Sequence, residues 1–448
     1  MLWQPWRVAI LGVFAWVIIW LLAPIQGITR ISGTATAYIA FCYAGFMAGC
    51  VMWEIARNGQ QPDEAETQAS FARFNGTGKI FWITFAVGLF GVASRFYDRT
   101  IVRGASLELE IAEAREMLQS EASSIFGTIG GFLSPFAYIP LLLLIMATGK
   151  QQNRPKLIAA LLLYVLPVID ASRQGSRSVM LIAVMLAIFT FALSRLNGKL
   201  LTPRFAATGV AISIVFAIAS TAIFSARLNS FQRDLSDASF NSVFAQSIGP
   251  NHEAKLGLYA RENLERGFYR VVVPNSLYYT SGVYEFSRLW HRPDGQNHTY
   301  GTEFIYPYTR VVTQLLGVSD LPEFLQPDEW SYYRPGVFTS LFGPIWVEWG
   351  YFGPFTMLLF GVIVTAISHK VRRGSLNLMP LYVLFLLILF YAPVANFLVI
   401  GHGFFCFNAF IAFAIFERLG ASDRRGNHRF DEPIAASLPP AGFRPLNH

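Results

Sequence analysis

The stretch from Ser178 to Arg195, SVMLIAVMLAIFTFALSR, decides the fold class. It carries no charge before its last position and is long enough to cross the roughly 30 Å hydrocarbon core of a bilayer as one helix. Similar runs recur along the chain. We expect ten transmembrane helices, at 8–24, 35–53, 79–98, 126–148, 157–171, 178–195, 206–226, 341–367, 378–396 and 399–417. The sequence therefore predicts an all-α integral membrane protein.

Composition supports this class. Of 448 residues, 53% are hydrophobic and 14% are charged, whereas soluble domains carry about 25% charged residues. The net charge of +7 would suggest nucleic acid in a soluble protein. In a membrane protein it reflects basic cytoplasmic loops, so we expect no nucleic-acid partner and take the lipid bilayer as the surrounding medium.

The distribution of Lys and Arg predicts the orientation. Basic residues gather around Arg7 and in the segments 57–79, 150–156, 195–204, 370–373 and 418–444. The short connections between them are poor in positive charge, with only Arg30 in 25–34 and none in 397–398. The positive-inside rule then places both termini in the cytoplasm. Span five, which ends near Asp170, is short. If it did not cross the membrane, the predicted orientation of every span before it would be inverted.

The chain divides into four parts. Residues 1–226 form an N-terminal bundle of about seven spans, 227–340 a large periplasmic loop, 341–417 three further spans and 418–448 a disordered cytoplasmic tail. The loop holds ten Lys or Arg, twelve Asp or Glu and twenty aromatic residues, an aromatic density too high for a disordered linker. We expect it to fold as helices, one of them from Glu262 to Val273, with turns at Pro250, Pro274, Pro293 and Pro307.

Several enzyme classes lack their signatures here. There is no phosphate-binding Walker loop, no dinucleotide-binding glycine pattern, no His-Glu-x-x-His and no Gly-x-Ser-x-Gly. The three cysteines, Cys42, Cys50 and Cys406, all fall in expected spans and have neither disulfide-framework nor metal-site spacing. We therefore expect no cofactor and no metal.

Arginines at the outer ends of spans are the first candidate site. Guanidinium groups bind diphosphate or carboxylate oxygens bidentately and stay charged. Anchoring to lipid headgroups is the alternative use of such side chains. There are two groups of such arginines. The first is Arg95, Arg99 and Arg103, which are four residues apart and would share one face of a continuous helix, beside Asp98. The second is Arg173 and Arg177, which have the same spacing.

Two further residues are candidates inside spans. Glu348 lies in a Gly- and aromatic-rich stretch, and a carboxylate within the membrane is expensive unless it is paired or used. A structural ion pair, or a hydrogen bond to the Gly-rich backbone, is the alternative. His402, in Gly401-His402-Gly403, is either a catalytic base or a helix-packing histidine.

Three short motifs resemble those of one known family. Thr339 to Gly353 reads Thr-Ser-x-x-Gly-Pro-x-x-x-Glu-x-Gly-x-x-Gly, Gly175 to Ser178 reads Gly-Ser-Arg-Ser, and Arg95 to Gly104 reads Arg-x-x-Asp-Arg-x-x-x-Arg-Gly. Together with the late periplasmic loop, they resemble bacterial oligosaccharide repeat unit polymerases of the Wzy type. The Arg-x10-Gly pattern of some members is missing from the loop, where Arg270 to Gly282 is one residue too long.

The resemblance implies a glycosyltransferase of the inner membrane. Such enzymes move a growing glycan from undecaprenyl diphosphate onto a new lipid-linked repeat unit, and chain-length regulators and a flippase are their expected partners. Arg177 and Arg173, with Arg99 and Arg103 behind them, would then hold the diphosphate. Glu348 or His402 would act as the base. Sugar or diphosphate would contact the loop at Arg270, Arg310 and Arg334.

Three alternatives remain. An O-antigen ligase uses the same donor but transfers the glycan to lipid A-core, and the Glu348 segment favours the polymerase over it. A transporter of lipid-linked glycans predicts repeat symmetry and a charged central path, neither of which the sequence shows. A structural scaffold would not need an aromatic-rich, folded loop.

Overall fold

A computed structural model gives the fold. It describes residues 4–57, 78–105, 113, 117–118, 124–146, 154–172, 176–194, 211, 217–222, 247–260, 262–291, 298–302, 304–305, 308–309, 311–312, 339–398 and 401–428, with side chains up to residue 416 in the last range. Seven described helices, some of them broken, are long and apolar enough to cross a bilayer. They are Pro5–Leu22, Gly33–Ala56, Lys79–Val102, Ile125–Met146, Arg154–Ser172, Arg177–Ser194 and Phe342–Arg372.

These findings agree with an all-α membrane protein, whereas the count of ten spans stays a prediction. Shorter apolar helices, Leu376–Phe390 and Gly401–Phe416, fall on the last two expected spans. Most of the expected span 206–226 lies outside the described residues. The last helix, α18 (Gly401–His428), extends into the segment that we expected to be a disordered tail.

The first two helices pack against the last part of the chain. Helix α1 (Pro5–Leu22) lies on α17 (Met379–Phe390), and α2 (Gly33–Ala56) runs along α16 (Gly353–Arg372). Glycines make the second contact close: a Cβ at Gly45, Gly49 or Gly361 would collide with the backbone of the partner helix. Small residues allow such close approach between helices in membranes.

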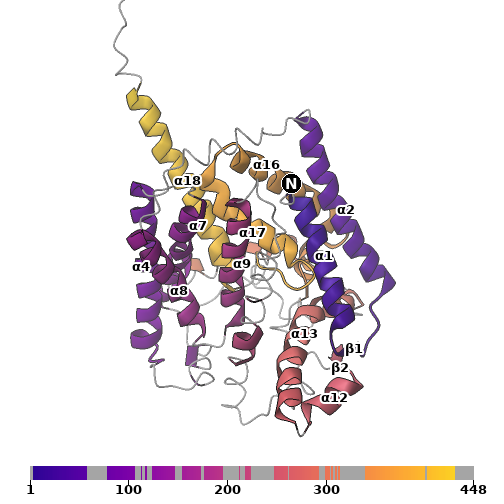
Figure 1. Cartoon of the computed structure of the whole chain (residues 1–448). Helices are drawn as coiled ribbons and strands as arrows, with labels where there is room; N and C mark the ends of the chain where they lie inside the picture. Colours follow the sequence, from indigo (N-terminus) through magenta and orange to yellow (C-terminus); the bar gives the residue numbers. More distant parts are fainter. Residues whose placement is uncertain are drawn as a thin grey trace, which may run out of the picture.

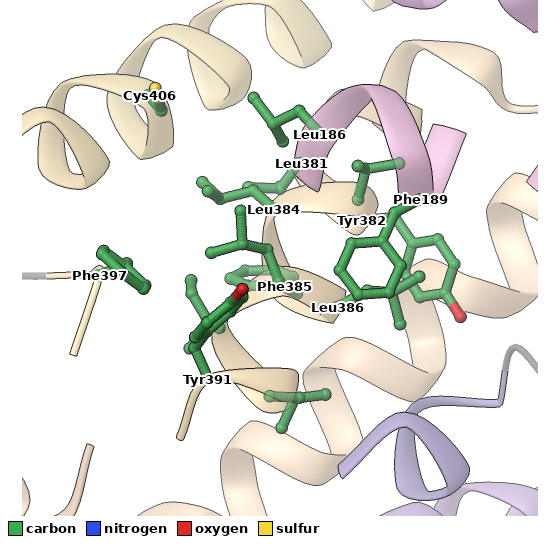
Figure 2. Packing of buried hydrophobic residues seen from close by; sticks show 14 of the residues in the cluster. Leu186, Phe189, Leu381, Tyr382, Leu384, Phe385, Leu386, Tyr391, Phe397 and Cys406 are labelled. Atoms are coloured by element: carbon green, nitrogen blue, oxygen red, sulfur yellow. The ribbon is translucent and has the colours of Figure 1, made fainter. Parts of the chain in front are cut away.

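Helix α17 lies at the centre of the bundle. Every residue from Met379 to Leu389 is buried. Figure 2 shows its side chains packed with residues of neighbouring elements, among them Leu186 and Phe189 from α9 (Arg177–Ser194). A helix that is apolar on all sides can be stable only when it is surrounded in this way.

The fourth spanning segment, Ile125–Met146, is broken by a 3-10 turn, and the neighbouring helices pack around it. Helix α4 (Lys79–Tyr97) packs on α6 (Ile125–Leu133) and on the 3-10 turn Ser134–Tyr138, which leads into α7 (Ile139–Met146). Helix α8 (Arg154–Ser172) contacts both α4 and α9. The last turn of α4 continues as a π-helical turn, Asp98–Val102.

The expected periplasmic loop contributes a long helix that packs into the bundle. Helix α13 (Asn263–Trp290) begins near the predicted position but continues through Pro274, so the turn that we expected there is wrong. Its first half is largely exposed, whereas most residues from Val273 onward are buried. Contacts such as Trp20 Nε1 to the Tyr284 hydroxyl, 2.9 Å, tie it to α1. This burial outweighs the backbone hydrogen bond that the proline removes.

A short two-stranded sheet joins the loop region to the first helical hairpin. Strand β1 (Ile25–Gly27) pairs antiparallel with β2 (Ile248–Pro250), with Ile25 opposite Pro250. Helix α12 (His252–Leu258) follows β2 and packs on α13. These elements lie together at the lower end of the bundle in Figure 1, which we call the α13 end.

Candidate functional site

The described candidate residues gather toward the α13 end of the bundle, in three groups on different elements. Arg99 and Arg103 belong to a cluster of charges at the end of α4, and His402 lies near it. Arg177 lies against α13, which also carries the half-buried Arg270, and Glu348 lies in a break between two helices. Arg173, Arg310 and Arg334 lie outside the described residues.

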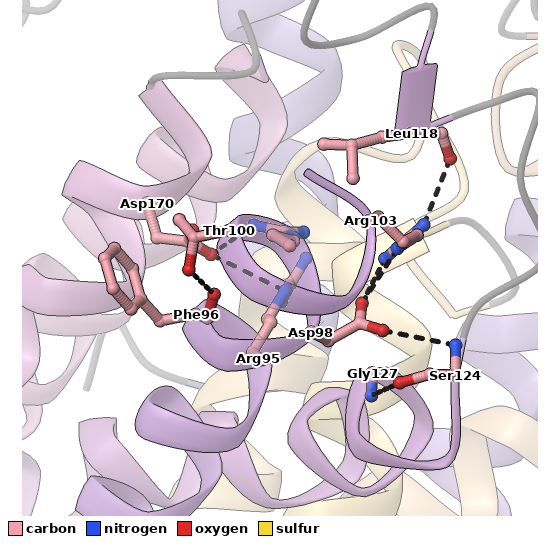
Figure 3. Close-up of polar contacts among 10 residues, drawn as sticks. Arg95, Phe96, Asp98, Thr100, Arg103, Leu118, Ser124, Gly127 and Asp170 are labelled. Atoms are coloured by element: carbon pink, nitrogen blue, oxygen red, sulfur yellow. Dashed lines mark hydrogen bonds and ion pairs between the residues drawn. The ribbon is translucent and has the colours of Figure 1, made fainter. Parts of the chain in front are cut away.

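The first group is an arginine–aspartate cluster: Arg95, Asp98, Arg99, Arg103 and Asp170. Both Arg95 and Arg99 reach across to Asp170 near the end of α8, Arg95 at 3.6 Å and Arg99 in a shorter contact. Arg103 turns back to Asp98, with its Nε 3.0 Å from the carboxylate, and Asp98 also accepts from the Ser124 N–H at 3.2 Å (Figure 3).

This cluster differs from three arginines on one face of a regular helix. The π-helical turn at Asp98–Val102 changes the helical phase, and Arg103 pairs with its own helix while Arg95 and Arg99 pair with α8. Three arginines against two aspartates leave a net charge of +1. Asp98 is fully buried, and pairing is what makes buried charge tolerable.

His402 lies beside this cluster and is buried. Its Nε2 is 2.9 Å from the Tyr138 hydroxyl, and Arg95 and Arg99 are close enough to act on it electrostatically. The Tyr138 ring packs edge-on against Tyr164 of α8, and the His402 ring is edge-on to Tyr138. The His402 side chain thus joins α18 to the turn after α6, as the helix-packing alternative expects.

The second group forms around Arg177, the first residue of α9. Its guanidinium lies over the ring of Tyr278 from α13, with Cζ 4.8 Å from the ring centroid. Such stacking is a cation–π contact, which fixes the orientation of the guanidinium plane. Burial raises the pKa of Tyr278, and the nearby positive charge of Arg177 partly opposes this rise.

An apolar cavity of about 250 Å³ lies farther along α9, and neither Arg177 nor Tyr278 lines it. Leu181, one turn after Arg177 on α9, and Tyr279, the neighbour of Tyr278, both line it. Arg177 is close enough to Tyr279 to act on it electrostatically. The remaining lining residues come mainly from α1, α9 and the end of α17: Gly12, Ala15, Trp16, Ile19, Val184, Met185, Ile188, Ala217, Phe390, Tyr391 and Val394.

The third group surrounds Glu348. The expected span 341–367 is broken here: α15 (Phe342–Trp349) ends, a 3-10 turn runs from Gly350 to Phe352, and α16 begins at Gly353. Gly350 has φ +51°, a conformation that favours glycine. The Glu348 carboxylate accepts the backbone N–H groups of Gly301 and of Phe304, the latter at 2.6 Å. Glu348 therefore anchors Gly301 and Phe304 to the break.

Several residues at these sites carried no recognisable signal in the sequence. Tyr278, Tyr138 and the aromatic neighbours of Glu348 become important only through contacts with residues far away in the chain. Asp170 was visible only as the end of a short span. A carboxylate at such a span end, with arginines at the end of another, is the one pattern that could have suggested the ion pair in advance.

Fold and site together define a helical membrane protein with buried charges, aromatic rings and an apolar cavity toward one end of its bundle. Comparisons with protein-family models, with curated proteins and with solved structures found no match.

Proposed function

We propose that this chain is a polysaccharide polymerase of the bacterial inner membrane, with both termini in the cytoplasm and the α13 end facing the periplasm. It would join undecaprenyl-diphosphate-linked oligosaccharide repeat units into a surface polysaccharide. The observation that carries the proposal is the position of Arg177 at the start of α9, one helical turn before Leu181, which lines an apolar cavity of the bundle. A cation next to an apolar cavity suits a lipid with an anionic phosphate head.

The cavity suits part of the lipid chain of the donor. Its walls are apolar side chains of α1 and α9, with the end of α17 between them, and its α13 side carries Tyr279. An isoprenoid segment would gain there from the contacts of a packed interior. Arg177 would then meet the diphosphate where the chain ends.

In the reaction, the bond between the donor sugar's anomeric carbon and the diphosphate oxygen breaks. A new bond forms from that carbon to a hydroxyl oxygen of the acceptor glycan, the hydroxyl proton passes to a water molecule, and undecaprenyl diphosphate leaves. Negative charge develops on the diphosphate as this happens. Arg177 would stabilise that charge, because a fixed cation acts without reorganisation at the moment of reaction.

The other candidate residues support the site in this proposal. Glu348 is a positioning residue, since its carboxylate accepts two backbone N–H groups of one segment. The arginine–aspartate cluster, with its net charge of +1, would add a longer-range attraction for the anionic donor. A chain-length regulator and a flippase are the partners expected for such an enzyme.

The experiment is deletion of the gene, followed by gel analysis of the surface polysaccharide and of the undecaprenyl-linked intermediates. Single repeat units without a long ladder are the result expected for a polymerase. Long undecaprenyl-linked chains that never reach the surface would instead identify a ligase. An unchanged profile would overturn both assignments.

A further inference from the structure

An aromatic cluster lies around the break between α15 and α16. Trp290, near the end of α13, and Trp346 of α15 have ring centroids 4.1 Å apart. Tyr38 of α2 stands edge-on against Trp346 at 5.0 Å, and Tyr351 does so at the same distance. We call the set the aromatic cluster; its members are Tyr38, Phe286, Trp290, His298, Trp346 and Tyr351.

Three buried polar atoms in or beside this cluster have no hydrogen-bond partner within the described part of the chain. They are Trp346 Nε1, His298 Nδ1 and Thr299 Oγ1. Trp346 is only 4% exposed, and its ring meets that of His298 edge-on at 5.4 Å. Leaving a buried polar atom without a hydrogen bond is energetically costly. Three such atoms close together therefore point to a polar ligand.

The polypeptide holds this arrangement firmly. The backbone oxygens of Val347 and Glu348 each accept an N–H, from Thr299 and Tyr300 respectively, both at 3.0 Å. Tyr300 has φ +44°, which is rare for an aromatic residue, and the residue is 69% exposed. Backbone strain of this kind persists only where the surroundings impose it, and it concentrates at functional sites.

We propose that the aromatic cluster is a saccharide-binding subsite for a pyranose ring of the glycan. This inference rests on the proposed function and deepens it, because it assigns where the glycan lies. The apolar C–H face of a pyranose packs on the negative face of an indole ring, here the half-buried Trp290. Its hydroxyl groups accept from Trp346 Nε1 and hydrogen-bond with His298 Nδ1 and Thr299 Oγ1.

Tyr351 controls access to this subsite. Its side chain is 77% exposed and stands edge-on to both indole rings. Because Tyr351 is so exposed, its side chain has room to rotate away from Trp346. The Glu348 carboxylate accepts the N–H groups of Gly301 and Phe304. These bonds help to hold His298 and Thr299, which come just before Gly301, in position.

Two simpler roles fit the geometry less well. Aromatic residues that anchor a protein at the membrane interface keep their polar edge in water, whereas Trp346 Nε1 is buried. A purely structural core would be filled with apolar side chains or with satisfied polar groups. The unpaired atoms therefore favour a ligand over both roles.

The test measures binding of free oligosaccharide to the full-length protein in lipid nanodiscs without sugar-headed detergent. The probe is the single repeat unit released by mild hydrolysis from the host's own surface polysaccharide, followed by calorimetry and saturation-transfer NMR. Trp346→Phe keeps an aromatic ring but removes Nε1, and we expect about tenfold weaker binding. His298→Phe, a second variant in case the first fails to fold, should weaken it similarly. Trp82→Phe is the matched control, since Trp82 is exposed on α4.

Absence of binding to the wild-type protein, or equal binding by wild type and both variants, would overturn the subsite. This outcome is separate from failure of the proposed function. If gene deletion removes the long ladder but the repeat unit does not bind, the polymerase stands and the subsite falls. If the repeat unit binds through Trp346 but deletion leaves the polysaccharide unchanged, the subsite stands and the polymerase falls.

Discussion

Arg177 is the residue on which the proposed chemistry depends most. Its guanidinium stacks on Tyr278, and the helix that it begins, α9, lines the apolar cavity from Leu181 onward. Loss of one preorganised charge donor at a reacting oxyanion typically costs about 100- to 1,000-fold in rate. We therefore expect Arg177→Ala to remove the long polysaccharide ladder on a gel while the protein remains at wild-type abundance in the membrane.

Two variants make this prediction specific. Arg177→Lys keeps the charge but loses the planar fork, so it should give an intermediate ladder. Arg30→Ala removes an exposed arginine from the connection between α1 and α2, and it should leave the ladder unchanged. A full ladder from Arg177→Ala would remove this residue from the mechanism.

Tyr278 predicts a change in stability at high pH. Because burial raises the pKa of its phenol, the folded state keeps the proton after the unfolded state begins to lose it near pH 10. The stabilisation is thus fully present below about pH 10 and is lost as pH rises above that value. Thermal unfolding at pH 9 and pH 11 should show a smaller loss for Tyr278→Phe than for wild type.

The control for this experiment is Tyr259→Phe, which changes a 60% exposed tyrosine directly after α12. Its melting temperature should fall between pH 9 and pH 11 as much as that of the wild-type protein. Equal losses in all three proteins would show that ionisation of Tyr278 does not contribute.

Among the helices, the pairing of α2 with α16 depends on backbone contact. A Cβ at Gly49 would collide with the carbonyl of Leu358, whereas a Cβ at Gly33, the first residue of α2, meets nothing within 4 Å. Forcing extra volume into a packed interface costs about 1–3 kcal/mol. Gly49→Ala should therefore lower the melting temperature measured in detergent, and Gly33→Ala should not. A neutral Gly49→Ala would mean that the two helices separate easily.

Some elements could be predicted from the sequence and others could not. Apolar length placed the spanning helices, because the bilayer imposes it on each segment separately. The continuation of α13 through Pro274 depends on its burial against α1 and against the residues after α17, near Val394. Local propensity does not include these contacts, and it therefore predicted a turn at Pro274. The same limit applies to the end of α17 at Phe390, since the next residues form turns packed on α13 rather than the continued helix expected to residue 396.

The site was predictable in residue type but not in grouping. Arg177, Glu348 and His402 were recognised as costly residues at or near membrane depth. Their partners lie on other segments, between 44 and 264 residues away in the chain. These partners are Tyr278, the backbone of Gly301 and Phe304, and Tyr138. No periodicity connects such positions, so contacts of this kind require the tertiary structure.

Orientation of the whole molecule can be measured with single cysteines. The native Cys42, Cys50 and Cys406 are buried, so they can be replaced by Ala to provide a background. Glu253→Cys on α12 should react with a membrane-impermeant maleimide in spheroplasts. Arg57→Cys, at the other end of α2, should react only after lysis, because both positions are exposed but lie at opposite ends of the bundle. The reverse pattern would place the termini outside the cytoplasm.

The pairing of α2 with α16 also has a consequence for biosynthesis. Cys50 and the Gly361 carbonyl that it contacts are 311 residues apart. Ribosomes add roughly 5–20 residues per second, so α2 emerges about 15–60 s before its partner exists. During that interval its glycine-lined face is open to lipid, to insertion chaperones and to membrane proteases. Nascent chains that stall before α16 should therefore be degraded quickly, and quality control of this protein would act on an exposed helix face rather than on an unfolded loop.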